Sequence, residues 1–187
     1  MEGLVSVRMS DNRIGEIPGG FSQLVNVTTI DFIENSLLTL PRELSQLPLL
    51  KTLLLNNNEF PTFPEAACLC TGLTDLQVNH NGIREIPSSV RFLTHMTNLD
   101  VSSNNVDRIS EGLGELLNLK KLLLSENQIA AVPRSLGRLT RLVTLDISCN
   151  RLTALPVEIG SLTNIEELEI YENSFEIMTN DVVSAPL

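Results

Sequence analysis

The sequence is poor in aromatic and in basic residues, and both shortages limit what it can do. Among 187 residues there is no tryptophan and one tyrosine, and aromatic residues make up only 4%. A core must therefore be aliphatic, since hydrophobic residues still account for 42%. Thirteen Lys and Arg stand against 23 Asp and Glu, which gives a formal net charge of -10. This balance argues against nucleic acid, whose phosphates require basic residues, and favours a protein partner with a basic or mixed-charge surface.

Residues that carry metal or thiol chemistry are also scarce, with two histidines and three cysteines in the whole chain. Cys68 and Cys70 are separated by a single residue, and neighbours that close seldom form a disulfide. We therefore expect reduced thiols and a cytoplasmic location. No further ligand lies near this pair in the sequence, so we predict no metal site and no cofactor. No run approaches the roughly 20 apolar residues of a membrane span, so we predict no membrane insertion.

The chain repeats itself every 23 residues. With Leu4 as position 1 of the first unit, further units begin at residues 27, 50, 73, 96, 119, 142 and 165, without insertion or deletion. Positions 1, 4 and 6 are hydrophobic in every unit. Position 9 is always asparagine, at Asn12, Asn35, Asn58, Asn81, Asn104, Asn127, Asn150 and Asn173. A strict period of this length indicates a solenoid, in which each unit buries its apolar residues against its neighbours.

Each unit reads LxxLxLxxNxL and then xxLPxxLxxLxx. Alternating apolar residues in the first half predict a short strand with one buried face, and successive strands stack into a parallel sheet. The asparagine follows the strand, where its amide can both donate to and accept from backbone groups of the turn. Proline stands at position 15 in six of the eight units and suits the first turn of a helix. We therefore expect one or two helical turns on the opposite side from the sheet.

These motifs resemble the leucine-rich-repeat family, in particular its regular 23-residue LPxxLxxL class. That class occurs in intracellular Ras-pathway scaffolds, Scribble-type polarity proteins and the repeat segments of Roco GTPases. The resemblance covers residues 4 to about 178. It implies an α/β fold: a right-handed, horseshoe-shaped solenoid with a parallel β-sheet on the concave face and short helices or 3-10 turns on the convex face. It also implies that the concave face binds protein.

We predict a single repeat domain over residues 1–187. No polar cap is recognisable before Leu4 or after Phe175, although the ends of a solenoid need covering to stay soluble. We therefore expect that the chain belongs to a longer protein, or that a partner covers its ends. End-to-end self-association through these edges is a further possibility that the sequence leaves open.

Side chains that flank the buried strand residues should point outward on the concave face. They comprise eleven acidic against four basic residues, and Glu166, Glu167, Glu169 and Glu172 all fall in the last unit. Ile33, Leu54, Leu123 and Tyr171 are apolar or aromatic residues that we expect to face solvent there, and tyrosine is enriched in interface hot spots. The predicted partner-binding residues are Asp31, Ile33, Glu34, Leu54, Asn57, Gln77, His80, Asp100, Leu123, Asp146, Glu169, Tyr171 and Glu172.

Catalysis is not predicted, and no catalytic residue is assigned. Cys149 and His80 occupy the same repeat position three units apart, which is roughly 14 Å at the strand spacing of a parallel sheet. A nucleophile and its base need about 3 Å. Asp146 and Glu169 fall on adjacent strands, but neither has a companion histidine or a calcium-loop pattern.

The function expected from the sequence is therefore a non-enzymatic protein-interaction scaffold or adaptor in intracellular signalling or assembly. Two alternatives stay open. The chain can be a regulatory or targeting segment of a larger signalling enzyme, such as a GTPase, a kinase or a ubiquitin ligase, or it can be a structural, cytoskeletal building block.

Overall fold

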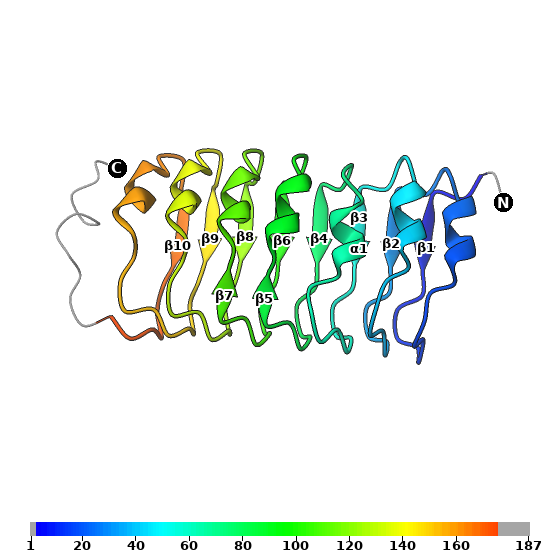
Figure 1. Ribbon diagram of the computed structural model, residues 1–187, viewed down its shortest axis with the longest axis horizontal. Helices are drawn as coiled ribbons and strands as arrows, with labels where there is room; N and C mark the ends of the chain where they lie inside the picture. The colour runs from blue at the N-terminus through cyan, green and yellow to red at the C-terminus, as the bar shows by residue number, and fades with distance from the viewer. Residues whose placement is uncertain (1–2, 176–187) are drawn as a thin grey trace.

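The computed structural model describes residues 3–175 as one continuous stack of similar turns. Figure 1 views it from the helical side, with the strands of the main sheet behind the helices and the first and last units at opposite ends of the stack. The predicted extension of the repeat domain to residues 1 and 187 lies outside the described residues. None of the helices among residues 3–175 has the length and hydrophobicity needed to cross a membrane.

Eight parallel strands form this sheet, one from each unit, in the order in which the units follow along the chain. They are β1 (Ser6–Arg8), β2 (Thr29–Asp31), β3 (Thr52–Leu54), β4 (Asp75–Gln77), β6 (Asn98–Asp100), β8 (Lys121–Leu123), β9 (Thr144–Asp146) and β10 (Glu167–Glu169). The register pairs residues 23 apart, as in Val7 with Ile30 and Leu145 with Leu168. The repeat length and the parallel sheet are those that the sequence predicts.

Among the described residues, a helical turn follows each of the first seven strands of this sheet, on the opposite side of the stack. Six of these turns are 3-10 helices: η1 (Gly19–Gln23), η2 (Arg42–Gln46), η3 (Ser88–Phe92), η4 (Glu111–Glu115), η5 (Arg134–Arg138) and η6 (Val157–Ser161). The third unit forms an α-helix instead, α1 (Glu65–Cys68), where Ala66 and Ala67 are strong helix formers and pack inside. Two further short strands, β5 (Glu85–Ile86) and β7 (Arg108–Ile109), pair beside the main sheet.

The prolines at position 15 sit one residue earlier than the sequence suggests. Pro18, Pro41 and their equivalents are the N-cap residues that precede each helix, in an extended conformation. The fixed φ of proline suits this conformation, and its missing N–H leaves no donor unpaired. In the fifth unit Ser110 takes the same place, and its hydroxyl accepts a hydrogen bond from the Gly112 N–H.

The space between sheet and helices is filled almost entirely by aliphatic side chains. At repeat positions 4 and 6, every residue from the second to the seventh unit is at most 1% exposed. Phe32, Phe60 and Phe63 are the buried aromatic exceptions. Because each apolar residue is covered by the same position of the units before and after it, the core runs uninterrupted along the stack.

The asparagines at position 9 tie each unit to the one before it. The side-chain nitrogen of Asn104 donates to the carbonyl oxygens of Val101 and Ser102 in its own unit and of Val78 in the preceding unit, at 3.0 to 3.1 Å. Its side-chain oxygen accepts the backbone N–H of Ile83, also in the preceding unit, at 3.0 Å. One side chain thus satisfies four backbone groups that the apolar core would otherwise leave unpaired.

The same set of bonds recurs at every asparagine from Asn35 to Asn173, and we call these side chains the asparagine ladder. Asn12 differs, because among the described residues it donates only to the carbonyl oxygens of Met9 and Ser10. The ladder also bends the chain just before it. The residue at position 8 has a positive φ of 50° to 58° in all eight units, although none of the eight is glycine. A left-handed conformation costs a non-glycine residue about 1 to 2 kcal/mol.

Removing an inner rung of the ladder should destabilise the protein far more than removing the outer one. Asn104→Ala leaves buried backbone groups unpaired and should lower the free energy of unfolding by about 3 kcal/mol, since each such group costs about 1 to 3 kcal/mol. Asn12→Ala removes only two local bonds and should cost less than about 1 kcal/mol. Urea denaturation followed by circular dichroism measures both. Equal losses would contradict the role given to the bonds between units.

Position 19 is glycine at Gly114, Gly137 and Gly160, and at Gly137 the missing side chain allows the next unit to pack closely. A Cβ at Gly137 in η5 would lie 2.3 Å from the Glu158 carbonyl oxygen, whereas a Cβ at Gly160 in η6 would meet no described atom within 4 Å. Gly137→Ala should therefore destabilise the protein by about 1 to 3 kcal/mol through overpacking. Gly160→Ala, at the same repeat position, should be neutral or stabilising by up to about 1 kcal/mol. A loss at Gly160 as large as at Gly137 would contradict this packing account.

Candidate protein-binding face

The outward face of the eight-stranded sheet, here called the concave face, presents its side chains in straight rows. The row at position 5 shows this best, because the register places Arg8, Asp31, Leu54, Gln77, Asp100, Leu123, Asp146 and Glu169 side by side on successive strands. Positions 7 and 8 form two further rows where the chain leaves the strands. Seven of the thirteen predicted partner-binding residues are in the first row, and the other six are in the latter two.

The residues at position 8 owe their placement to the left-handed turn. Glu34, Asn57, His80 and Glu172 all have positive φ and exposed side chains. The asparagine ladder fixes this turn in every unit, so these side chains project from a rigid backbone rather than from a mobile loop. His80 and Cys149 stand in this row three strands apart and do not meet, as the sequence predicts.

Three of the four predicted exposed apolar residues are more covered than expected. Ile33, Leu54 and Leu123 are half-buried, whereas Tyr171 is 57% exposed. The reason is the spacing of about 4.8 Å between strands, which lets side chains on the two adjacent strands cover a leucine from both sides. Tyr171 belongs to the last unit, so that among the described residues it has a neighbouring unit on one side only. It is the most exposed of the large hydrophobic side chains on this face.

Three of the predicted aspartates also serve the fold. Oδ1 of Asp100 accepts the backbone N–H of Ser102 at 2.9 Å and its hydroxyl at 2.6 Å. Asp146 makes the same two bonds to Ser148, and Asp31 accepts the N–H of Ile33. The Asp-x-Ser spacing is the signal that sequence reasoning missed, because it is a common local pairing of side chain and backbone. One oxygen of each aspartate is thus engaged, whereas the Glu169 carboxylate accepts no side-chain bond from a described residue and is the least committed of the predicted acids in this row.

Acidic groups gather at the end of the face formed by the last unit. Glu166, Glu167, Glu169 and Glu172 are all exposed and belong to the same unit as Tyr171. We call these five residues the acidic end. Only two of the four carboxylates accept a bond from a neighbouring side chain: Glu167 from the Thr144 hydroxyl and Glu172 from the Cys149 thiol. No basic side chain forms an ion pair with them among the described residues.

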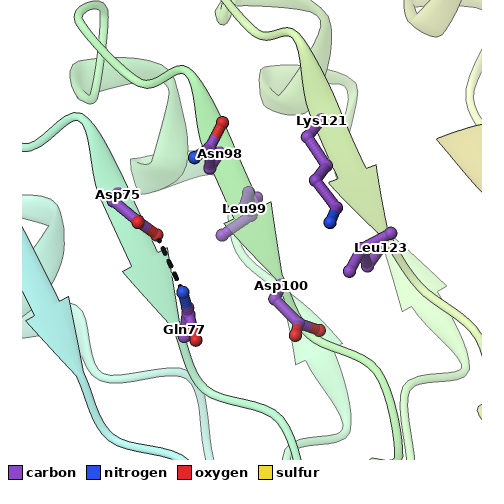
Figure 2. A pocket seen from close by; sticks show the side chains of 7 residues that line it. All are labelled: Asp75, Gln77, Asn98, Leu99, Asp100, Lys121 and Leu123. Carbon is purple, nitrogen blue, oxygen red and sulfur yellow. Dashed lines mark hydrogen bonds between the residues drawn. The ribbon is translucent and has the colours of Figure 1, made fainter. Parts of the chain in front are cut away.

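A shallow hollow of about 180 Å³ lies in the middle of the same face, on β4, β6 and β8. Figure 2 shows the residues that border it: Asp75, Gln77, Asn98, Leu99, Asp100, Lys121 and Leu123. Gln77 donates to Asp75 at 3.4 Å and accepts from Asn56 at 3.1 Å, which holds one wall in place. Asp75, Asn98 and Lys121 were not among the predicted residues, although position 3 shares the outward face of the strand with position 5. The hollow offers both charges and an apolar wall.

The thiols of the chain are poor nucleophiles. Burial raises the pKa of Cys68 and of Cys70 to about 11. The hydrogen bond to Glu172 raises the pKa of the Cys149 thiol, with partial burial adding to the effect. All three cysteines are free, and among residues 3–175 no group of three or more His, Cys, Asp and Glu is placed to hold a metal ion.

Two models of the leucine-rich repeat match the sequence. The "Leucine rich repeat" model matches residues 2–60, and the "Leucine Rich repeats (2 copies)" model matches residues 117–158. Together they cover more than half of the chain. No curated protein sequence matches it significantly.

Several solved structures are similar to the chain over almost its whole length. A leucine-rich-repeat protein of Leptospira interrogans is 28% identical, with a TM-score of 0.93, over 97% of this chain and 46% of its own. A second similar structure is the leucine-rich-repeat ectodomain of the Arabidopsis thaliana receptor kinase GASSHO1/SCHENGEN3, solved with Casparian strip integrity factor 2. It is 24% identical, with a TM-score of 0.76, over 99% of this chain and 26% of its own. A chain in the octameric complex of Latrophilin 3, Unc5D and FLRT2 is 22% identical, with a TM-score of 0.89, over 98% of this chain and 58% of its own. The latter two show the fold alone, and the chain spans less than two thirds of the length of each of the three.

The bond between Cys149 and Glu172 can be tested by thiol reactivity. Glu172→Gln removes the carboxylate that stabilises the protonated thiol, so the pKa of Cys149 should fall and its reaction with Ellman's reagent should become faster at pH 8. Cys68 and Cys70 should stay unreactive in the folded protein. Glu166→Gln removes an equal charge from the same unit and serves as the control. A pH–rate profile that is the same in the Glu172→Gln variant and the parent would contradict the assignment.

Proposed function

Because the chain belongs to the leucine-rich-repeat family, we propose that it is a non-enzymatic module that binds another protein on its concave face. The observation that carries this proposal is the acidic end, where an exposed tyrosine shares the last unit with four exposed carboxylates, on a backbone held by the asparagine ladder. A preorganised surface loses little conformational freedom when it binds, which favours affinity.

The chemistry of the acidic end indicates the kind of partner. Tyrosine buries a large, amphipathic ring at low entropic cost and is enriched among residues that dominate binding energy. Four exposed carboxylates in the same unit attract basic groups and accelerate encounter with a positively charged surface. We therefore propose a partner segment that presents lysine or arginine beside an apolar side chain. The central hollow, with its mixed charges, provides a second contact farther along the face.

The absence of catalysis is part of the proposal and has two supports. The thiols have raised pKa values, and the acidic pair Asp146 and Glu169 on adjacent strands lacks a histidine beside it. We propose the cytoplasm as its location and a scaffold or adaptor role in signalling or assembly as its setting. The free cysteines support a reducing compartment.

A second candidate is a regulatory or targeting segment within a larger signalling protein. The specific observation that favours it is coverage, because the chain spans 46% of the Leptospira protein and 26% of the receptor-kinase ectodomain chain. In that setting the concave face would bind a substrate or a regulator and so direct the activity of an attached domain. The site and its residues are the same in both candidates.

The site assignment predicts which variants lose the partner. Tyr171→Ala combined with Glu172→Lys should reduce partner capture by at least tenfold, because it removes the aromatic anchor and reverses one charge. The experiment is affinity capture by the tagged chain with quantitative mass spectrometry, using dilute bait. The control is Glu43→Lys with Glu65→Lys, which reverses two exposed carboxylates on the helical side. Circular dichroism confirms that each variant is folded. If the control loses the same proteins and the Tyr171 variant keeps them, the concave face is not the binding site.

A further inference from the structure

The two edges of the sheet expose side chains that every inner unit buries. At one edge Met9, at position 6, is 38% exposed, and at the other Leu168, at position 4, is 36% exposed. The residues at these positions in the second to seventh units are at most 1% exposed. Exposed apolar residues on an edge strand are a common site of association between chains. Both edges therefore expose apolar surface that association with another chain would bury.

The edge at β1 is a groove rather than a flat end. Leu4, Val7, Met9, Phe21 and Leu24 line it, with Gly20 leaving it open. The edge at β10 presents apolar residues from the matching repeat positions, with Ile165, Leu168 and Ile170 at positions 1, 4 and 6 and Phe175 at position 11. Inside the stack, side chains of these positions pack directly on one another. On the sheet side of the stack, the two edges are thus the two halves of the contact that the chain makes with itself at every inner step.

The backbone groups of the two edges are complementary as well. Within the stack, the N–H groups at positions 6, 8 and 9 of one unit donate to the carbonyl oxygens at positions 5, 7 and 8 of the next, as Met9 does to Asp31 and Asp11 to Ile33. In the last unit the donors are Ile170, Glu172 and Asn173, which have no such acceptor among the described residues. In the first unit the acceptors Arg8, Ser10 and Asp11 have no such donor.

The bonding pattern of the asparagine ladder is incomplete at the edge formed by β1. In the seven later units the side-chain oxygen accepts a backbone N–H from the preceding unit, and the oxygen of Asn12 accepts none from a described residue. The donor at the equivalent place in the last unit is the Phe175 N–H. A second copy stacked behind β10 would give Asn12 this partner.

The charges at the two edges are complementary when β1 of one copy stacks on β10 of another. One further step of the register would place Arg8 of a second copy directly opposite Glu169, and both side chains are exposed. Opposite charges on directly paired residues stabilise adjacent strands. Asp11 of the second copy would lie beside Glu172, which places two acidic residues next to each other. Asp11 and Glu34 are acidic neighbours of the same kind within the chain, so the row at position 8 already accommodates such a pair.

We propose that copies of this chain associate head to tail, with β1 of one copy pairing in parallel with β10 of the next in the same 23-residue register. The contact is heterologous, because it joins two different surfaces, and so it can extend into a string of copies along the solenoid axis. It leaves the concave face open, and each added copy lengthens that face by eight strands. This inference does not depend on the proposed binding partner.

Paired charge reversals test the proposal in the full chain without any partner. Sedimentation velocity or light scattering of the parent should show a mass that rises with concentration. Arg8→Glu and Glu169→Arg should each weaken this association by about tenfold, because each places like charges opposite one another. The double variant Arg8→Glu/Glu169→Arg restores an opposite pair and should associate as the parent does. Lys121→Glu, a reversal on the inner strand β8, should leave association unchanged, and circular dichroism should show all variants folded.

Mixing the two single variants distinguishes head-to-tail contact from any symmetric dimer. The Arg8→Glu copy and the Glu169→Arg copy each repel themselves, but each edge of one is complementary to the facing edge of the other. An equimolar mixture should therefore associate in alternation at concentrations at which neither variant alone does. A parent mass that stays monomeric up to the highest soluble concentration would overturn the proposal. So would association that the single reversals leave unchanged, or that the mixture fails to restore.

Discussion

The hydrogen bonds of the asparagine at position 9 are the constraint on which the rest of the structure depends. Each inner side chain satisfies three carbonyl oxygens and one N–H, and two of these four groups belong to the preceding unit. A repeat of this kind cannot bury its apolar residues alone, so the same bonds that turn the chain also fix the register between units. The regular rows of the concave face follow directly, because a register of 23 residues repeats every outward position on the neighbouring strand.

The ladder also explains why the binding face is rigid where it leaves the strands. The left-handed residue before each asparagine costs about 1 to 2 kcal/mol in a non-glycine residue, and the chain accepts this at Glu34, His80 and Cys149 alike. Four hydrogen bonds at the next residue offset that cost. The side chains at position 8 are consequently presented at a fixed angle, and a partner finds them already ordered. The binding function proposed for the face rests on this order as much as on its charge.

The parallel sheet and its helical side were predictable from the sequence because the repeat is strict and its apolar positions match a strand and a short helix. Details that depend on neighbours in space were not. The half-burial of Leu54 and Leu123 arises from side chains on adjacent strands, and the α-helix of the third unit arises where two alanines pack inside. The aspartates that cap Ser102 and Ser148 were seen only as charges. For the binding face, the sequence indicated which residues point outward. It did not indicate that Tyr171 is the one largely exposed residue among the four apolar or aromatic ones predicted there, or that Asp75, Asn98 and Lys121 border a hollow.

Hydrogen–deuterium exchange of the chain with and without a captured partner tests the central claim most directly. The account predicts that the partner slows exchange in peptides that cover β9, β10 and the turn through Asn173, where the acidic end lies, and that peptides of η2 and α1 on the helical side are unchanged. Protection confined to the helical side, with no change in the peptides of the last two strands, would contradict the claim that this protein binds through its concave face.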